Sequence, residues 1–297
     1  PETPLLLGDL SLDSLNNADE VILSPGLSRQ IPAIQVAIES DIPVINDIEL
    51  FARSARAPII AITGSNGKST VTTLLGEMFI AAGHPIGIGG NLGTPALDLL
   101  DEKVKFYILE LSSFQLESIS NLSAEAATVL NISPDHMDRY KTLLDYHQSK
   151  HRIFNGARQV IINRDDRLSA PLVGEGVKSS SFGLNRPDLN CFGLLAAEDG
   201  EIWLAYEFEK LIPQKQLGIR GSHNISNALA ALALGKAVNL PFQPMLKVLQ
   251  KFNGLPHRYQ VLKTLHGVTY INDSKATNLG ATIAAINASP ISNNIVL

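Results

Sequence analysis

The sequence is poor in cysteine, in long apolar runs and in clustered basic residues, and each shortage excludes a class of protein. A single cysteine, Cys191, excludes an internal disulfide framework and fits a reducing compartment. No apolar run is long enough to predict a membrane span, and the start of the chain has no signal-peptide pattern. A formal net charge of −5 without any basic run argues against a nucleic-acid surface. We expect a cytoplasmic protein that binds neither membranes nor nucleic acids, and we expect it to be a monomer.

The remaining composition is that of a core-forming globular chain. Of its 297 residues, 45% are hydrophobic, which is enough for one large core and parts of others. Apolar runs alternate with helical spacing, a rhythm typical of parallel strands joined by crossover helices. We predict an α/β fold of two or three domains. Because Pro1 is not a methionine and residues 294–297 look like a strand without its turn, we expect the chain to be part of a longer protein.

One stretch, AITGSNGKST at residues 61–70, organises the rest of the chain. The apolar run over 58–62 predicts a buried strand, and the apolar spacing over 69–82 predicts a helix. A glycine-rich turn between a strand and a helix is typical of phosphate-binding loops. The spacing here, G-x-x-G-K-S, is shorter than the general G-x-x-x-x-G-K-[ST], and a simple glycine turn is the alternative.

The residue types in this loop suit a nucleotide. Gly64 and Gly67 let backbone N–H groups approach phosphate oxygens, and the helix N-terminus adds a positive dipole end. Lys68 supplies a mobile cation, and Ser69 can hold Mg²⁺. Lysine and serine directly after the second glycine are hard to explain by turn geometry alone, so we predict that a nucleotide binds here.

Two strand ends further along carry side chains that can bind a metal. Residues 106–109 predict a buried strand that ends in Glu110, as does the Walker B carboxylate beside a nucleotide's Mg²⁺. An ordinary exposed glutamate is the alternative. Residues 128–131 predict another strand, and His136 follows it between two aspartates. This histidine suits metal ligation or charge positioning, although a lone strand-end histidine is more often structural.

The predicted helix over 144–154 carries three side chains with an ordinary interpretation. Lys150 is by default solvated, because nothing in its local sequence indicates otherwise. His147 and His151 are spaced i, i+4 and could hold a metal together, but the glutamate of H-E-x-x-H is absent. For all three we favour the ordinary interpretation on local grounds.

Several loop residues have a binding role and a structural role that the sequence leaves open. Gly26 follows a predicted strand end, where open α/β sheets place ligands, but an ordinary turn is equally compatible. Asn91 lies in a second predicted glycine-rich loop, 87–93, and its amide could donate to an anion. Asn224 and Asn227 lie at a predicted helix start, where they could face a base or cap the helix.

The last part of the chain predicts a ligand edge. Arg258 lies in a turn, and residues 260–265 and 268–271 predict two strands. A polar loop follows, with Asp273 and Lys275 two residues apart. Such a loop after a strand, leading into a helix, is typical of a binding site.

Taken together, the motifs resemble the Mur ligase family of ATP-dependent ligases in peptidoglycan synthesis, and within it the branch that adds D-glutamate. Each stretch is weak alone, but seven in family order are specific. They cover residues 63–70, 90–93, 109–116, 131 with 135–140, 221–224, 255–258 and 271–278.

The resemblance implies an α/β fold whose centre is a phosphate-loop, mostly parallel sheet flanked by helices, with partial Rossmann-like domains at both ends. We assign residues 1–46 to part of a UDP-substrate domain, 47–253 to the ATP-binding ligase domain and 254–297 to the start of an amino-acid domain. The early glycine loop of the family's first domain and most of its third domain have no counterpart here. A chain limited to these parts is expected to bind ATP but to turn over poorly or not at all.

The implied reaction is formation of an amide bond. The family moves the γ-phosphoryl of ATP onto the L-alanyl carboxylate of UDP-N-acetylmuramoyl-L-alanine, and the amine of D-glutamate then displaces phosphate. Lys68 and two Mg²⁺ ions would offset the repulsion between carboxylate and triphosphate. The lysine that matches Lys150 is carbamylated in the family, which turns a cation into a carboxylate-like Mg²⁺ ligand.

The resemblance also assigns roles to individual residues. Those implied to be catalytic are Lys68, His136 and Lys150. Those implied to bind metal are Ser69, Glu110, His136 and Lys150. Those implied to bind ATP are Gly64, Ser65, Asn66, Gly67, Lys68, Ser69, Thr70, Asn224, Asn227, Arg258 and Asp273. Those implied to contact the other substrates are Gly26, Asn91, Ser112, Lys275 and Thr277.

Two other functions remain open. A related ligase that adds a different amino acid, or a folylpolyglutamate synthetase, shares the loop and the reaction, but residues 109–116 and 271–278 count against it. A nucleotide-binding module without turnover, such as a GTPase-like switch, would need an N-K-x-D guanine-reading motif, which is absent.

Overall fold

The computed structural model describes residues 18–120 and 122–288, together with Leu5, Leu7, Gly8, Leu10 and Leu15. The strand expected over residues 294–297 lies outside the described residues.

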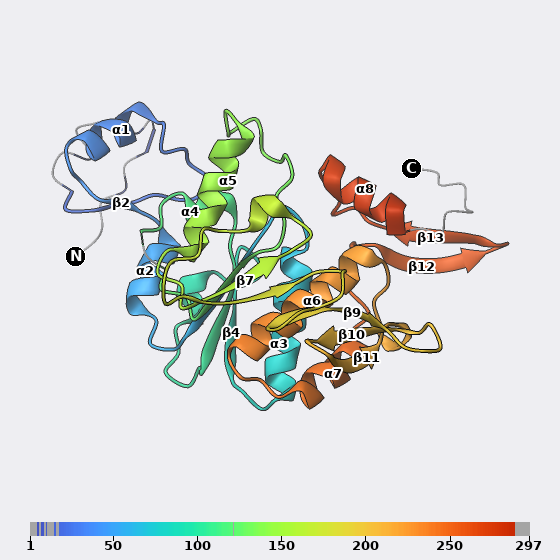
Figure 1. Ribbon diagram of the computed structural model, residues 1–297. Coiled ribbons are helices and arrows are strands. Elements are labelled where there is room, and N and C mark those ends of the chain that lie inside the picture. The colour runs from blue at the N-terminus through green and yellow to red at the C-terminus, as the bar shows by residue number, and fades with distance from the viewer. Residues whose placement is uncertain are drawn as a thin grey trace.

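The centre of the molecule is a nine-stranded sheet (Figure 1). The strands from β4 to β9 pair in parallel, and β10 and β11 add an antiparallel edge. The predicted mostly parallel sheet is therefore confirmed. In spatial order the strands are β11 (Glu209–Pro213), β10 (Ile202–Tyr206), β9 (Cys191–Ala196), β8 (Lys178–Phe182), β7 (Gln159–Asn163), β6 (Ala126–Val129), β3 (Ile59–Thr63), β5 (Phe106–Glu110) and β4 (Ile86–Gly90).

Helices cover both faces of the sheet, which explains why β3 reads as a continuous apolar run. Ile60 and Ile62 point to one core, and Ile59 and Ala61 point to the other. The first face is covered by α3 (Lys68–Ala81), α6 (Ser222–Ala237) and α7 (Phe242–Lys251). The second is covered by α2 (Asp47–Ser54), α4 (Ser113–Leu116) and α5 (Leu143–His151). Short 3-10 turns lie at Ala96–Leu99, Arg152–Phe154, Arg167–Ser169 and Gln214–Gln216.

The predicted glycine-rich loop over 87–93 is wrong in its first half, because those residues form the edge strand β4. The glycines are needed for close packing and do not mark a loop. A Cβ on Gly89 would lie 2.1 Å from the carbonyl oxygen of Thr94, and a Cβ on Gly87 would lie 2.7 Å from the ring of Tyr107. Glycine in a strand therefore records a close neighbour here.

Smaller units flank the sheet at both ends of the described chain. Strands β1 (Val21–Ile22) and β2 (Val44–Ile45) pair in parallel around α1 (Pro32–Glu39). Strands β12 (Gln260–Leu265) and β13 (Val268–Asn272) form the two predicted strands as an antiparallel hairpin, followed by α8 (Leu279–Ala288). In Figure 1 the hairpin and α8 stand beside the sheet next to α6. The domain limits at 46 and 253 remain predictions.

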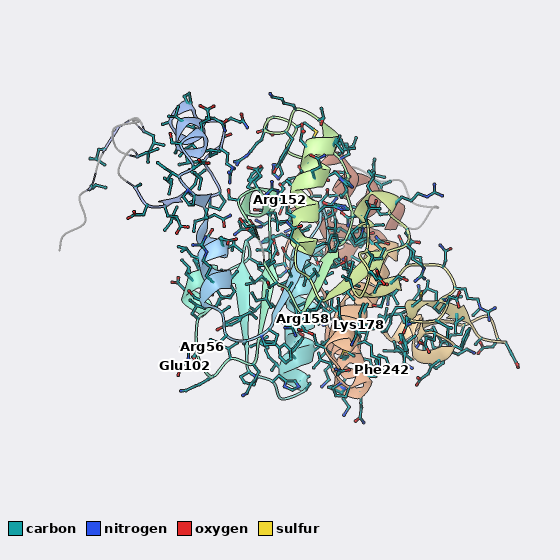
Figure 2. The ribbon with its side chains drawn as sticks, turned by 60° about the vertical axis from the view of Figure 1, so that its left-hand side comes forward. Arg56, Glu102, Arg152, Arg158, Lys178 and Phe242 are labelled. Carbon is teal, nitrogen blue, oxygen red and sulfur yellow. The ribbon has the colours of Figure 1, made fainter. Side chains whose placement is uncertain are left out.

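The two edges of the parallel sheet differ. The carboxyl ends of β3, β5 and β6 lead into the glycine loop, Glu110 and the His136 loop. At the opposite edge Arg158 and Lys178 lie next to each other (Figure 2), and Arg158 is 3.6 Å from a carboxylate oxygen of Glu125. Open α/β sheets bind ligands at the carboxyl ends of their strands, so the first edge is the candidate site. None of the helices described here is both long and apolar enough to span a bilayer.

Candidate active site

The glycine loop connects β3 directly to α3, as predicted. Gly67 has φ +85°, and a Cβ there would lie 2.5 Å from Oδ1 of Asn227 on α6. Gly64 has φ +156°, and a Cβ there would lie 3.0 Å from the Cβ of Leu130. Both glycines are therefore required by a left-handed backbone that passes close to neighbouring elements.

Residues after β6 hold this loop in place. The side chain of Asn131 accepts a hydrogen bond from the backbone N–H of Asn66 (2.8 Å) and donates to its carbonyl (3.0 Å). The hydroxyl of Ser65 donates to the carbonyl of Ser133 and accepts from its N–H, both at 3.0 Å. It also lies 3.0 Å from the hydroxyl of Tyr146, whose pKa burial raises to about 12. The loop is thus fixed from outside before any phosphate binds.

Two lysines converge on one carbonyl of the loop. Lys68 donates to the carbonyls of Gly64 (2.7 Å) and Ser65 (3.0 Å). Lys150, on α5, donates to the same carbonyl of Gly64 (3.0 Å) and to Oγ1 of Thr63 (3.3 Å). Only 1% of Lys150 is exposed, so the local interpretation of a solvated lysine is wrong. The reason is tertiary, because α5 packs its lysine face under the loop.

The electrostatics of the pair favour the neutral form of Lys150. Burial lowers the pKa of Lys68, and the charges of Glu110 and Asp135 partly offset this effect. Burial lowers the pKa of Lys150 well below its ordinary value, and the charge of Lys68 lowers it further. The neutral form of a lysine amine is nucleophilic, so the lowered pKa of Lys150 favours reaction at its nitrogen.

Glu110 lies where the Walker B comparison expected it, at the carboxyl end of β5 beside β3. Only 2% of the residue is exposed. One carboxylate oxygen accepts from the side-chain amide of Asn91 (2.9 Å). The other, Oε2, is buried, and no hydrogen-bond partner for it exists among the residues that the structure describes. A buried anionic oxygen without a donor is suited to a cation.

The loop after β6 places an aspartate toward the lysines and leaves the histidine more open. Asp135 exerts its charge on both Lys68 and Lys150. The side chain of His136 is 48% exposed, with Nε2 3.7 Å from Oδ2 of Asp135 and its ring 4.9 Å from that of Phe114. His136 has φ +55°, so the loop turns sharply at this residue. The predicted catalytic histidine is therefore linked to the lysines through Asp135.

A pocket lies between the glycine loop, the first turns of α6, the start of the hairpin and α8. It brings together most residues that the resemblance assigned to ATP, from segments far apart in the sequence. The predicted residues that line it are Asn66, Gly67, Thr70, Asn224, Asn227, Arg258, Asp273 and Lys275. Its further lining residues are Asn131, His223, Ser226, Tyr259, Ala276, Ala281, Ala284 and Ala285.

The asparagines at the start of α6 do not cap it. The helix begins at Ser222, its N-cap position is Gly221, and no side chain caps it. Asn224 donates to the carbonyl of Arg220 (2.9 Å), and Asn227 donates to Oδ1 of Asn224 (3.3 Å). Of the two roles that the sequence left open, the structure excludes capping.

The hairpin contributes to the same pocket. Arg258 donates to Oγ of Ser69 (2.9 Å) on α3. Asp273 accepts from the backbone N–H of Tyr259 (2.9 Å), which fixes the loop after β13 against the turn before β12. Arg258 and Ser69 lie 189 positions apart in the sequence, which is why sequence spacing cannot reveal their hydrogen bond.

The other residues predicted to contact substrate do not line this pocket. Ser112 is the N-cap of α4, where it forms a capping box with Gln115. Gly26 lies in an exposed turn. Thr277 donates its N–H to the carbonyl of Lys275 within a turn (3.0 Å). Local structure thus accounts for Ser112 and Thr277, and their binding roles remain predictions.

Sequence reasoning missed Asn278 as a site residue. Its amide donates to Oδ1 of Asn66 (3.2 Å) and to Oδ2 of Asp135 (3.2 Å), while its Oδ1 accepts from the N–H of Ala281 at the start of α8. It therefore joins α8 to the glycine loop and to the His136 loop. The only indication in the sequence was that Asn278 follows Thr277 at the end of the last motif. The sequence does not show toward which residues its side chain points.

His147 and His151 stack at a ring-centroid distance of 3.9 Å. A ring nitrogen of His151 lies 2.8 Å from the carbonyl of Leu168, so it is turned away from a shared metal. No group of three or more His, Cys, Asp or Glu side chains that could hold a metal ion exists in the described part of the chain.

His151 leads to a pH-dependent prediction. Burial, and to a lesser extent His147, lowers the pKa of His151. As the pH falls below about 6.5, the unfolded chain takes up this proton first, so the free energy of unfolding should decrease until the folded pKa is passed. Urea unfolding of the wild type and of His151→Gln between neutral and mildly acidic pH measures the effect. We expect a shallower slope in the variant, and parallel profiles would contradict the prediction.

The comparisons with known proteins agree with this geometry. A model described as the Mur ligase middle domain matches residues 62–235, and one described as the Mur ligase MurD-like N-terminal domain matches residues 1–46. The first match covers more than half of the chain, so the chain belongs to the Mur ligase family. The resemblance drawn from the motifs is confirmed.

Curated relatives narrow the comparison to one member of that family. The UDP-N-acetylmuramoylalanine–D-glutamate ligase of Pseudomonas savastanoi is 58% identical over 299 residues, covering 100% of this chain and 66% of the relative. That of Pseudomonas aeruginosa is 57% identical over 286 residues, covering 96% and 64%. That of Acinetobacter baylyi is 54% identical over 280 residues, covering 94% and 62%. The chain thus spans slightly less than two thirds of the length of these relatives.

Solved structures share the fold. A pseudomurein peptide ligase type C from Methanothermus fervidus aligns with a TM-score of 0.64 at 18% identity, covering 96% of this chain and 67% of that one. MurF from Acinetobacter baumannii aligns with a TM-score of 0.62 at 20% identity, covering 80% and 55%.

Proposed function

We propose that this chain carries the ATP-dependent core of a ligase that joins D-glutamate to UDP-N-acetylmuramoyl-L-alanine in peptidoglycan synthesis. The observation that carries the proposal is the convergence of Lys68, Lys150, Glu110 and Asp135 around one glycine loop. The identity to D-glutamate ligases supports the choice of amino acid. A cytoplasmic location and a monomeric state belong to the same proposal.

ATP binds with its phosphates in the loop from Gly64 to Thr70. Backbone N–H groups at the N-terminus of α3 and the ammonium of Lys68 are complementary to phosphate charge. The nucleoside extends into the pocket, where amides and hydroxyls suit its polar groups and the alanines of α8 give an apolar wall. Polar residues in this role are Asn224, Asn227, Arg258, Asp273 and Lys275.

The reaction proceeds in two displacements. A carboxylate oxygen of the L-alanyl group attacks the γ-phosphorus, the bond to the β-phosphate oxygen breaks, and ADP leaves. The amine nitrogen of D-glutamate then attacks the acyl carbon, and phosphate departs with the electron pair as the nitrogen loses a proton. Lys68 lowers the repulsion in the first displacement by facing the phosphates. Gly26, Asn91, Ser112, Lys275 and Thr277 are the proposed contacts of the other two substrates.

The residues present fit Mg²⁺. Glu110 offers a buried carboxylate oxygen without a donor, and Ser69, His136 and Lys150 complete the proposed set of ligands for two ions. Burial and the charge of Lys68 lower the pKa of Lys150 well below its ordinary value and so favour the neutral amine, which can add to CO₂, forming a carbamate and releasing a proton. Bound Mg²⁺ supplies charge neutralisation between carboxylate and triphosphate.

A steady-state assay tests the proposal, and it uses a protein of the same length as the relatives that contains this chain. Phosphate release from ATP should require both UDP-N-acetylmuramoyl-L-alanine and D-glutamate, with one amide formed per phosphate. Free replacement of D-glutamate by a diamino acid would assign a different member of the family. ATP binding without turnover when all substrates are present would favour a nucleotide-binding module.

Asn278 yields a prediction at the pocket. Asn278→Ala removes the bridge to Asn66 and Asp135 and the cap of α8, interactions worth on the order of 1 kcal/mol each. We expect binding of a non-hydrolysable ATP analogue, measured by calorimetry, to weaken by about 10-fold. Asn155→Ala, at an exposed position, is the control and should bind normally. Equal affinity of the Asn278 variant and the wild type would show that the bridge does not shape the pocket.

A further inference from the structure

One guanidinium joins three segments of the molecule. Arg139, just after His136, donates from Nη1 to the carbonyl of Pro25 (3.0 Å) and from Nη2 to the carbonyl of Leu27 (3.1 Å). Nη2 also donates to a carboxylate oxygen of Glu117 (2.8 Å). The side chains of Arg139 and Glu117 are 16% and 18% exposed, so water screens the pair only weakly. The N-terminal turn is thus tied directly to the central sheet domain.

The planar face of Arg139 is used as well. Its guanidinium carbon lies 4.2 Å from the ring centroid of Phe114, and that ring lies 4.9 Å from the ring of His136. The arginine therefore clamps Phe114, and Phe114 supports the histidine. A lysine could donate to the same carbonyls, but it has no planar fork with which to stack and donate in several directions.

Glu117 connects this clamp to the glycine loop. Its second carboxylate oxygen accepts from the hydroxyl of Tyr140 (2.5 Å). The Tyr140 ring meets that of Tyr146 edge to face at 5.3 Å, and the Tyr146 hydroxyl lies 3.0 Å from that of Ser65. A continuous path of side-chain contacts thus runs from the N-terminal turn to the phosphate-binding loop. Both ends of this path belong to the proposed reaction site.

We propose that Arg139, held by Glu117, is a positioning residue that fixes the turn at residues 24–27 against the His136 loop and so sets where the sugar-linked carboxylate meets ATP. The inference rests on the proposed function. Arg139 contacts protein carbonyls, a carboxylate and a ring, which gives it no direct part in phosphoryl transfer. It acts through the turn it holds, and a misplacement of about 1 Å can cost about 10²-fold in rate.

Steady-state kinetics of Arg139→Lys and Arg139→Gln separate positioning from general damage. In a protein as long as the relatives, we expect the KM for the UDP-linked substrate to rise at least about 10-fold. The KM for ATP should stay within about twofold, because Arg139 does not touch the nucleotide pocket. Arg139→Lys should recover less than a tenth of the loss. Equal changes in all KM values, or full activity in either variant, would overturn the proposal.

The matched control is Arg53→Lys. Arg53 lies on α2 and also connects to the N-terminal segment, because it pairs with Glu20 at 2.8 Å, but it does not hold the turn. We expect its kinetic constants to be those of the wild type. In a double-mutant cycle, Glu117→Gln should add little to Arg139→Gln, since the two side chains act as a unit. Full additivity would show that Glu117 does not hold the arginine.

Hydrogen exchange tests the positioning claim without any catalysis. The N–H of Leu27 donates to the carbonyl of Ser24 within the turn (2.9 Å). We expect this amide to exchange at least about 10-fold faster in Arg139→Gln than in the wild type and in Arg53→Lys. An unchanged rate would overturn the inference even in an active ligase. A faster rate in a protein that lacks ligase activity would support the inference and count against the proposed function.

Discussion

Within a protein as long as the relatives, Lys150→Met is expected to lower the proposed ligase turnover by at least about 10³-fold, while the free energy of unfolding of the chain stays the same or rises. The two effects have one cause. Lys150 is 1% exposed, donates to a hydroxyl and a carbonyl, and has a pKa well below its ordinary value. Its buried amine is costly to the fold, because none of the acids in the described part of the chain forms an ion pair with it, and methionine fills a similar volume without the polar end.

Turnover is measured as amide formation, and stability is measured by urea unfolding of the chain. Carbon-13 NMR in labelled bicarbonate should show a carbamate signal in the wild type and none in the variant. Lys178→Met is the control, because Lys178 is an exposed lysine at the opposite edge of the sheet (Figure 2). A fully active Lys150→Met enzyme, or a large loss of stability, would refute the assigned role of the lysine.

Local patterns predict the centre of the fold well. The apolar run before the loop, the two glycines and the helical spacing after it each act within a few residues, and β3 and α3 begin and end within one residue of their predicted limits. Glu110 is predictable for a related reason. A charged residue that ends an apolar strand lies at the same edge as its neighbours when the strands are parallel.

The direction of Lys150 is not a local property. Spacing within 144–154 shows that a helix forms, but not which neighbour it covers, and a buried lysine has the same sequence signature as a solvated one. Only the resemblance to a family indicated a role. The structure shows where the side chain of Lys150 points, because Lys150 and Lys68 both donate to the carbonyl of Gly64.

Contacts between residues far apart in the sequence could not be predicted either. Asn278 meets Asn66 across 212 positions, and Arg139 meets Pro25 across 114. The glycines of β4 led to a wrong prediction for another reason. In a sequence, a glycine that is needed for close packing looks the same as a glycine that marks a turn. The sequence thus predicted the chemistry that is proposed for the site, and tertiary packing decides which polar groups lie there.

Glu110→Gln should lower turnover by about 10²–10³-fold and raise the Mg²⁺ concentration for half-maximal rate at least about 10-fold. The change is isosteric, and the glutamine oxygen can still accept from Asn91, so the fold should be kept. The variant loses the anionic charge at the buried oxygen that has no described donor. It also removes the charge that partly restores the pKa of Lys68, so the ammonium of Lys68 becomes easier to deprotonate.

A magnesium titration of the ligase rate separates this loss from a folding defect, because a metal ligand changes the midpoint and a structural residue changes only the amount of active enzyme. Glu125→Gln is the control. Its carboxylate pairs with Arg158 at the opposite edge of the same sheet, where a cation at the nucleotide is out of reach. An unchanged midpoint in Glu110→Gln would remove Glu110 from the proposed metal ligands, since the variant lacks the negative charge that a divalent cation requires.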